Sequence, residues 1–291
     1  MFDRLTDSRG RKSLAAVLAA ALVLQPLAPA LAGPPEQATR LYQRLTGTAP
    51  DAATLQTLVS DISSHNNMAA AQLAMQDPNF YDVTVRNFAA PMSNKAQSIF
   101  VPLNDYTATI IGMVRDNVPF NTVLSADLLY VGDSSKVSGL SAHPYSYSND
   151  DHYTYLDSAS ADLSSVLEAQ TQSQLTGISS SATAGVLTTY AGASAYFYLG
   201  TNRAMVRFTM MDYLCDDLNV IEDVTRPPDR IRQDPSRSPG GDSRVFLTQC
   251  IGCHSGMDAL AGAFAYYDFN TTSNEMVYTP GQVQHKYGIN T

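Results

Sequence analysis

The pattern of apolar and polar positions predicts a chain built mainly from α-helices. Residues 36–45 place Leu41 and Leu45 on one helical face, and Gly47 ends that segment. Asp51 is positioned to cap a second helix, in which apolar residues recur at helical spacing. The same periodicity predicts further helices over residues 68–75, 80–88, 99–114, 163–175 and 203–218.

Three other stretches break the helical pattern. Residues 133–157 are rich in Gly, Ser, Asp and Tyr, which predicts a long loop or short strands. Four tyrosines in or beside that loop alternate as on a strand: Tyr145, Tyr147, Tyr153 and Tyr155. Residues 179–184 are small and predict a linker. Proline and glycine recur through residues 226–241, which excludes a continuous helix and predicts an extended connector rich in Pro, Gly and Arg.

The N-terminal residues have the pattern of an export signal. Basic residues in positions 1–13 precede an apolar run over 14–27, and Ala30-Leu31-Ala32 forms a small-x-small cleavage pattern. The alternative, a membrane anchor, is disfavoured because polar and proline residues interrupt an already short apolar run. We expect residues 1–32 to be a signal peptide, so the protein is periplasmic or extracellular and meets the membrane only during export.

Composition narrows the class of protein further. The 291 residues are 44% hydrophobic, enough for a folded core, and only 15% are charged. The net charge of −9 argues against nucleic acid as a partner and favours a protein partner with a basic face. Three cysteines are too few for a disulfide-stapled scaffold.

The chemistry is concentrated in Cys250-Ile-Gly-Cys253-His254, a C-x-x-C-H motif that predicts one covalent haem c. On a helical turn, thiols three positions apart lie on one side and can each bond a haem vinyl group. His254 then reaches the iron as the proximal ligand. Phe246 lies one turn earlier and can pack on the porphyrin edge. We therefore expect residues 33–225 to form an α-helical domain and residues 242–291 a small cytochrome c-like haem module.

Two other uses of a C-x-x-C pair fit less well. A thioredoxin-like redox pair belongs after an early strand in a βαβ unit, whereas this pair follows a proline-rich connector near the C-terminus. A zinc site needs a second pair of ligands, and only Cys215 and scattered histidines remain. Cys215 is then most simply a buried free thiol.

The motif and its surroundings resemble the planctomycete-type cytochrome c family, exported bacterial proteins with a C-terminal haem module. Asp258, four residues after the histidine, and the aromatic-Asp ending at Asp268 follow the family pattern, while Ala259 stands where proline is usual. Looser similarities extend upstream over most of the mature chain, at residues 44–50, 114–120, 124–128, 184–188 and 203–215. The resemblance implies an exported monohaem protein and leaves its reaction undefined.

The haem's role depends on the distal ligand to the iron. Met276 lies far enough after the motif to cross the haem and is the ligand we predict; His285 and three methionines of the 203–218 helix (Met205, Met210 and Met211) are rivals. Met257 lies one turn after His254, on the same side, and cannot reach over the haem. Each methionine also has a plainer interpretation as core packing.

The leading hypothesis is an electron carrier. One alternative is a haem peroxidase or oxidase with an open distal site; another is a surface binding or structural protein in which haem is secondary.

Two weaker patterns in the sequence have plainer interpretations. The oxygen-bearing residues Asn149, Asp150, Asp151 and Asp157 lack the spacing of a recognised calcium loop. Arginines in and beside the connector can pair with haem propionates or lie in solvent.

Overall fold

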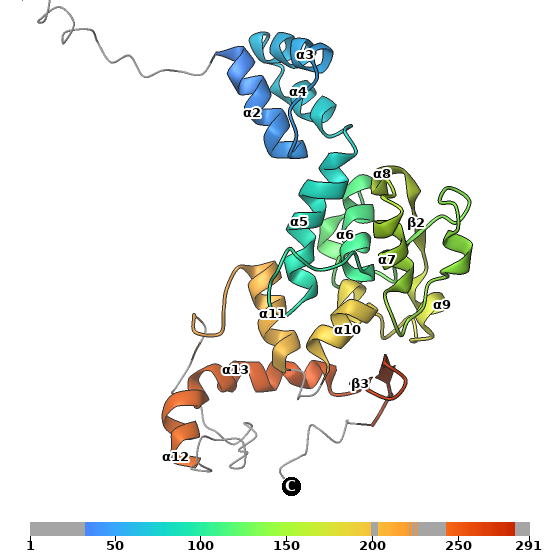
Figure 1. Ribbon diagram of the computed structural model, residues 1–291. Helices are drawn as coiled ribbons and strands as arrows, with labels where there is room; N and C mark the ends of the chain where they lie inside the picture. The colour runs from blue at the N-terminus through green and yellow to red at the C-terminus, as the bar shows by residue number, and fades with distance from the viewer. Residues whose placement is uncertain (1–32, 199–202, 221, 223–224, 226–242, 283–291) are drawn as a thin grey trace, which may run out of the picture.

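The computed structural model describes residues 33–198, 203–220, 222, 225 and 243–282. The predicted signal peptide, the connector over 226–241 and His285 lie outside the described residues. The described chain is mainly helical, which confirms the predicted mainly α class, while the cytochrome c-like module stays a prediction. It forms an elongated molecule with α2, α3 and α4 at one end and α13 and β3 at the other (Figure 1). Within the described residues, every helix is too short or too polar to cross a membrane.

The N-terminal unit consists of α2 (Pro34–Thr46), α3 (Ala52–Ser63) and α4 (Asn67–Ala74). Gly47 ends α2 in the left-handed conformation, with φ of 75°, which favours glycine. The Asp51 carboxylate accepts a hydrogen bond from the backbone N–H of Thr54 at 2.8 Å, so the predicted cap is confirmed. The unit has a small core of its own: Ala38, Tyr42, Leu58, Ile62, Ala70 and Ala74.

A bent helical segment joins this unit to the body. It begins as a π-helix, η1 (Phe80–Val85), continues as α5 (Arg86–Ala89) and ends in the 3₁₀ turn η2 (Ala90–Ser93). The helix predicted over 80–88 is therefore present, with a π-helical first turn. The hydroxyl of Tyr42 donates a hydrogen bond to the carboxylate of Asp77, which ties α2 to the chain entering this segment.

The centre of the body is α6 (Asp105–Arg115), whose residues from Asp105 to Met113 are all buried. It begins later than the pattern over 99–114 predicts. Pro102 disfavours helical geometry in the residue before it, and Asn104 caps the helix by accepting a hydrogen bond from the N–H of Thr107 at 2.9 Å. Gly112 lets the ring of Tyr130 pack directly on α6, because a β-carbon there would lie 2.1 Å from the ring.

The predicted helix over 163–175 is wrong. The structure has a short helix α8 (Leu163–Val166), then strand β2 (Leu167–Gln170), then α9 (Gln172–Thr176). β2 pairs antiparallel with β1 (Leu129–Gly132), with Leu129 opposite Gln170. A segment of only four residues fits a helix turn or a strand equally well in the sequence, and the distant partner β1 decides between them.

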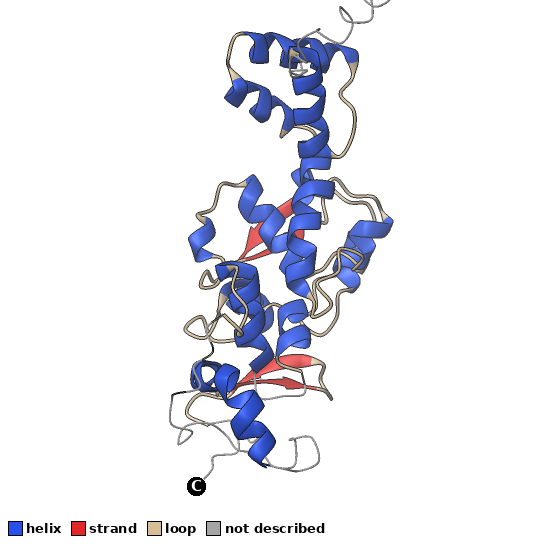
Figure 2. Cartoon of the chain, turned by 90° about the vertical axis from the view of Figure 1, so that its left-hand side faces the viewer, coloured by secondary structure: helices blue, strands red, loops and turns tan. Residues whose placement is uncertain are grey.

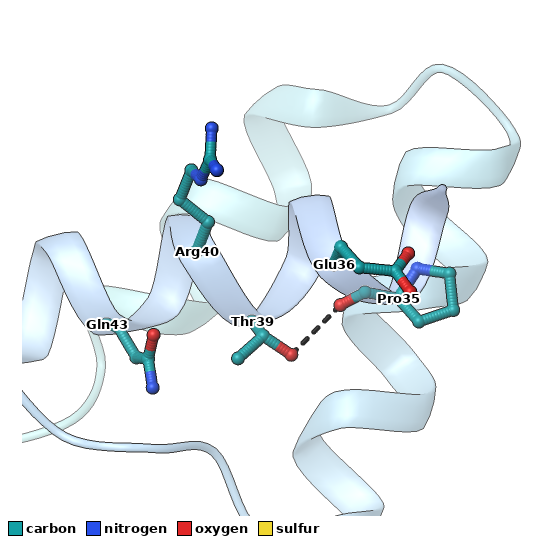
Figure 3. Close-up of a pocket in the computed structure, with 5 residues that line it drawn as sticks. All are labelled: Pro35, Glu36, Thr39, Arg40 and Gln43. Carbon is teal, nitrogen blue, oxygen red and sulfur yellow. Dashed lines mark hydrogen bonds between the residues drawn. The ribbon is translucent and has the colours of Figure 1, made fainter. Parts of the chain in front are cut away.

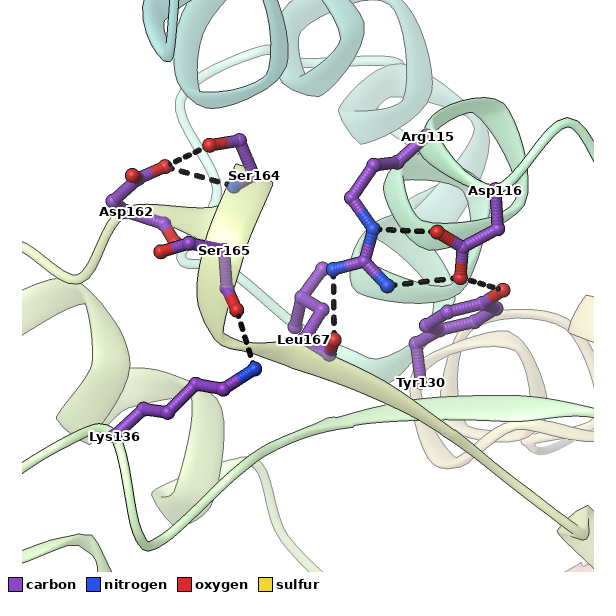
Figure 4. A network of polar contacts seen from close by, with 8 residues as sticks. All are labelled: Arg115, Asp116, Tyr130, Lys136, Asp162, Ser164, Ser165 and Leu167. Atoms are coloured by element: carbon purple, nitrogen blue, oxygen red, sulfur yellow. Dashed lines mark hydrogen bonds and ion pairs between the residues drawn. The ribbon is translucent and has the colours of Figure 1, made fainter.

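A polar network joins this strand pair to the end of α6 (Figure 4). The guanidinium of Arg115 donates two hydrogen bonds to the carboxylate of Asp116, at 2.7 and 2.8 Å, and a third to the carbonyl of Leu167 at 2.7 Å. The hydroxyl of Tyr130 donates to Asp116 at 2.7 Å. Because these contacts join the end of α6 to residues of both strands, the network positions β1 and β2 against α6.

The stretch over 133–157 is only partly the predicted loop. A 3₁₀ turn η4 (Leu140–Ala142) precedes α7 (Asp151–Ser158), so Tyr153 and Tyr155 lie on a helix and the predicted strand-like alternation is wrong. Tyr153 is fully buried and donates a hydrogen bond to the carbonyl of Tyr130 at 2.8 Å. That tertiary contact holds a helix whose composition alone does not favour one. Another 3₁₀ turn, η3 (Phe120–Thr122), precedes β1.

The remaining elements form the lower part of the molecule. They are η5 (Gly185–Thr188), α10 (Tyr190–Tyr196), α11 (Arg203–Leu214), α12 (Ser243–Val245), the π-helix η9 (Phe246–Cys250), α13 (Ile251–Ala261), η10 (Gly262–Phe264), β3 (Tyr267–Asn270) and β4 (Glu275–Tyr278). β3 and β4 pair antiparallel as a second two-stranded sheet, well separated from the first (Figure 2). The hydroxyl of Tyr267 donates to the carbonyl of Ala182 at 2.7 Å, so the C-terminal strands pack back onto the helical body.

Candidate functional site

The C-x-x-C-H motif spans a change of helix type. Cys250 is the last residue of the π-helix η9, and Cys253 and His254 lie on the first turn of α13. All three residues are half-buried, and both cysteines are free thiols. The thiols are therefore accessible to a covalent partner and come from one continuous helical segment, as the motif predicts.

The three motif residues line one pocket of about 440 Å³. One wall comes from η9 and α13: Cys250, Cys253, His254 and Met257. The other wall comes from α11 and the turn that follows it: Arg207, Asp217, Leu218 and Asn219. The structure thus brings together the two thiols and the imidazole, and residues about 40 positions earlier in the chain complete the lining.

An apolar contact between α11 and α13 holds the two walls together. Val206 and Met210 of α11 pack with Met257 and Ala261 of α13, and all four are buried. Cys253 packs against this cluster. Figure 1 shows α11 descending onto α13, so the motif lies at the contact between the helical body and the C-terminal segment.

An ion pair lies at the edge of the pocket. Nε and Nη2 of Arg207 donate to the two carboxylate oxygens of Asp217 at 2.8 and 2.7 Å. Nearly half of the Arg207 side chain is exposed to solvent, so the pair contributes little to stability. It does hold the turn over 217–219 against α11, which sets the position of Leu218.

The charged groups around the pocket act on the second thiol of the motif. Burial raises the pKa of the Cys253 thiol, and the negative charges of Glu222 and Asp217 raise this pKa further, while Arg207 lowers it. Among the residues that the structure describes, no group of three or more His, Cys, Asp or Glu side chains is arranged to hold a metal ion.

Met276 is not brought together with His254. It lies on β4, is 3% exposed, and packs in an apolar cluster with Phe269, Tyr267 and Met205. Cys253 belongs to a different cluster, the one that contains Met210 and Met257. The structure thus places Met276 in the core of the C-terminal strand pair. Its role as a metal ligand stays a prediction.

Three other residues that the sequence singled out are described only in part or not at all. Phe246 begins η9, four residues before Cys250, but its side chain lies outside the described part of the structure, as does that of Asp258. His285 lies outside it altogether. The predicted packing of Phe246 on the porphyrin edge therefore stays a prediction.

The prediction that Cys215 is buried is wrong. The residue is exposed and has φ of 57°, the left-handed conformation in which a helix often ends. It follows Leu214, the last residue of α11, so the turn that carries Asp217 and Leu218 to the pocket pushes Cys215 outward.

A second buried polar cluster lies away from the pocket. The carboxylate of Asp105 accepts hydrogen bonds from the backbone N–H groups of Tyr190 and Ala191, at 2.5 and 3.0 Å, and so caps α10. Burial raises the pKa of Asp105 to about 6. Burial and the nearby charge of Asp105 raise the pKa of Asp150 to about 8. One carboxylate oxygen of Asp150 is buried without a hydrogen-bond partner among the described residues.

Asp157, which the sequence grouped with Asp150, has a structural partner. It forms a bidentate ion pair with Arg86, with distances of 2.6 and 2.7 Å, and accepts a hydrogen bond from the N–H of Leu103. Its carboxylate therefore joins α5, α7 and the chain before α6. Asp157 therefore belongs to a different polar cluster from Asp150.

Another depression follows the outer face of α2 (Figure 3). It measures about 350 Å³ and is lined by Pro35, Glu36, Thr39, Arg40 and Gln43. The hydroxyl of Thr39 donates to the carbonyl of Pro35 at 2.9 Å, an ordinary contact within a helix. Because all its residues come from one face of one helix, the depression lacks a second wall that would enclose a ligand.

The sequence did not identify the second wall of the haem-motif pocket. Arg207, Asp217, Leu218 and Asn219 carry no motif, and the predicted helix over 203–218 gave no indication that the segment turns back at Cys215. The positive φ of Cys215 is visible only in the structure.

No protein-family model, curated protein or solved structure matches the chain, so interpretation of the site rests on its own residues.

Proposed function

We propose that the chain is an exported monohaem c-type cytochrome that carries single electrons through a covalently bound haem. The observation that supports this most is the convergence of Cys250, Cys253 and His254 on one pocket. Two thiols for thioether bonds and an imidazole for the iron are the donor set that haem c requires. Haem supplies a one-electron couple when bound, and the chain supplies the ligand and the burial that set its potential.

The pocket also has the mixed lining that a haem needs. Met257 and Leu218 are buried and apolar, whereas Arg207 and Asn219 are exposed at the rim. An apolar interior accommodates the porphyrin, and the exposed rim suits the charged propionate edge. Arg207 is a donor of suitable geometry for a carboxylate, as its fork-like contact with Asp217 illustrates.

The charge of the chain bears on its partner. The net charge of −9 favours encounter with a redox protein that presents a basic face. The proposed location, outside the cytoplasm, rests on the pattern of residues 1–32. It agrees with the chemistry, since thioether attachment of haem c takes place after export.

The test is a pyridine haemochrome assay on protein matured in a bacterial periplasm with a haem-attachment system. We expect one c-type haem per chain in the wild type, and none remaining after replacement of both motif cysteines by alanine. Cys215→Ser is the matched control and keeps one haem per chain, because that thiol is exposed. Wild-type protein without covalent haem contradicts the proposal.

A second variant tests the role of His254. His254→Ala retains the covalent haem, because the thioether bonds do not depend on the imidazole once formed. Its iron is misligated, so its optical and paramagnetic resonance spectra differ from those of the wild type. Unchanged ligation spectra in this variant would show that another residue is the proximal ligand.

A further inference from the structure

The turn between β3 and β4 carries a sequence pattern that the haem site does not use. Asn270 is followed by Thr271 and Thr272, so the turn contains Asn-x-Thr, and no other asparagine of the sequence has Ser or Thr two positions later. In exported proteins this pattern is the acceptor for an N-linked glycan where it lies in an accessible surface turn. The structure therefore shows whether an enzyme can reach the asparagine.

The pairing of β3 with β4 turns Asn270 toward the solvent. Phe269 lies opposite Met276 in the register, and both are buried. Successive side chains of a strand point to opposite faces, so the burial of Phe269 directs Asn270 outward. Asn270, Thr271 and Thr272 are all exposed, at one end of the elongated molecule (Figure 1). The pattern therefore lies in the kind of surface turn that a modifying enzyme reaches.

Hydrogen bonds hold this turn in place. The side-chain amide of Asn274 donates to the carbonyl of Ser148 at 2.6 Å and to the hydroxyl of Tyr190 at 2.8 Å, which attaches the turn to the helical body. The Oδ1 of Asn270 accepts a hydrogen bond from the backbone N–H of Thr272 at 2.8 Å. Because Oδ1 faces the backbone of the turn, the other branch of this exposed side chain, Nδ2, faces away from that backbone. Nδ2 is the atom to which an N-linked glycan is attached.

An acidic side chain lies beside the acceptor. Asp268 precedes Asn270 by two residues on β3, so the two side chains share the outer face of the strand. A carboxylate in this position can form a charge-assisted hydrogen bond with a cationic group of the transferase. One face of β3 thus offers an enzyme both an anchoring charge and the nitrogen to be modified.

We propose that Nδ2 of Asn270 is the acceptor of an N-linked oligosaccharide, which a membrane-bound oligosaccharyltransferase transfers after export from a polyprenyl diphosphate carrier. Nδ2 loses one proton and bonds to C1 of the first sugar. The bond between C1 and the diphosphate oxygen breaks, and the polyprenyl diphosphate leaves with the electron pair. This modification rests on the export that is part of the proposed function and is independent of the haem. Asn270 lies outside the lining of the motif pocket, so one chain can carry both groups.

The experiment produces the protein in a bacterium that has a haem-attachment system, an oligosaccharyltransferase and a lipid-linked oligosaccharide of known mass. An established export signal replaces residues 1–32, so the result does not depend on the predicted signal. Intact mass spectrometry should show the wild type heavier by one oligosaccharide, and peptide mapping should place this mass on Asn270. Asn270→Gln should lose the added mass entirely.

Three exposed or half-buried neighbours supply the matched variants. Thr272→Ala keeps the asparagine and should lose the modification, whereas Thr272→Ser should keep it, since either hydroxyl completes the pattern. Thr271→Ala changes the middle position, which the pattern leaves open, and should also keep the modification. Asp268→Asn should reduce the modified fraction, and a fraction equal to that of the wild type would overturn the role of Asp268.

A wild-type chain that stays unmodified, while a reference acceptor protein in the same cells is modified, overturns the proposal. An oligosaccharide that persists in Asn270→Gln or in Thr272→Ala overturns it as well. The haem on Cys250 and Cys253 is measured in the same samples on a different peptide. A chain with the oligosaccharide and without haem contradicts the proposed function, and a chain with haem and without the oligosaccharide contradicts this inference, so the two failures are distinguishable.

Discussion

The hydroxyl oxygens of Tyr106 and Tyr213 lie 2.5 Å apart, so one hydrogen bond joins the buried helix α6 to α11. Tyr106 is fully buried, and Tyr213 lies near the end of α11, two turns beyond Arg207. The helix that forms one wall of the pocket is therefore anchored to the centre of the molecule.

Tyr213→Phe removes this anchor. We expect the free energy of unfolding to fall by about 1–3 kcal/mol, because the hydroxyl of Tyr106 is left buried without its partner. Urea unfolding followed by circular dichroism measures the change. Tyr198→Phe, at a position 41% exposed, is the control and changes stability little. Equal effects of the two substitutions would show that the Tyr106–Tyr213 contact does not stabilise the fold.

Asp150→Asn is expected to stabilise the protein at neutral and alkaline pH. The pKa of Asp150 is raised to about 8 in the folded state by burial and by Asp105, so the folded state retains a proton that the unfolded chain releases above pH 4. The contribution of Asp150 to the free energy of unfolding of the wild type therefore falls as pH rises from about 4 to about 8. Asparagine cannot ionise, so the variant should exceed the wild type by about 1 kcal/mol or more at pH 8.

The measurement is a series of urea unfolding curves between pH 4 and pH 8. Asp151→Asn is the comparison: it removes a neighbouring negative charge that raises the pKa of Asp150, so it should reduce the loss of stability between pH 4 and pH 8 far less than Asp150→Asn does. A difference between Asp150→Asn and the wild type that is constant across the series would contradict a buried, protonated Asp150.

We expect the free energy of unfolding to fall at acidic pH because of His152. Its Nε2 accepts a hydrogen bond from the backbone N–H of Gly132 at 2.8 Å, and burial lowers its pKa below the ordinary value of 6.5. The unfolded chain therefore binds a proton at pH values where the folded state does not, and stability at this site is lost as pH falls below about 6.5. His152→Gln keeps an acceptor but cannot titrate.

Thermal unfolding at pH 7.5 and pH 5 checks this expectation. The loss of stability between the two pH values should be smaller in His152→Gln than in the wild type. His65→Gln, at an exposed position just after α3, is the control. An identical pH dependence in His152→Gln and the wild type would exclude His152 as the acid-sensitive group.

Gly112→Ala tests the packing of β1 on α6. A β-carbon at Gly112 would lie 2.1 Å from the Tyr130 ring, so the ring must move out of a filled core. We expect a loss of about 1–3 kcal/mol or more, or failure to fold. Gly262→Ala is the control, because a β-carbon there meets open space. Comparable yields and unfolding midpoints for the two variants would contradict this close approach.

The elements that the sequence predicted correctly are those specified by local signals. The helix α2 has both its apolar face and Gly47 at its end, and α3 has Asp51 as its cap. In contrast, β2 depends on pairing with β1, and α7 depends on burial of Tyr153 beneath β1. These are contacts between segments distant in the chain, which no local pattern contains.

The same distinction holds at the candidate site. Cys250, Cys253 and His254 were identified because their chemistry requires adjacent positions in the chain. Leu218 and Arg207 were missed because they reach the pocket only through the packing of α11 on α13 and the reversal of the chain at Cys215. Met276 was chosen by chain length alone, whereas its burial depends on the pairing of β3 with β4.

The central claim is the covalent haem, and intact mass spectrometry tests it most directly. Wild-type protein matured in the periplasm should carry the added mass of one haem, and a proteolytic fragment containing Cys250 and Cys253 should carry all of it. The variant with both cysteines replaced by alanine should show the mass of the polypeptide alone. An unmodified wild-type mass, or a haem located on any other fragment, would contradict the account.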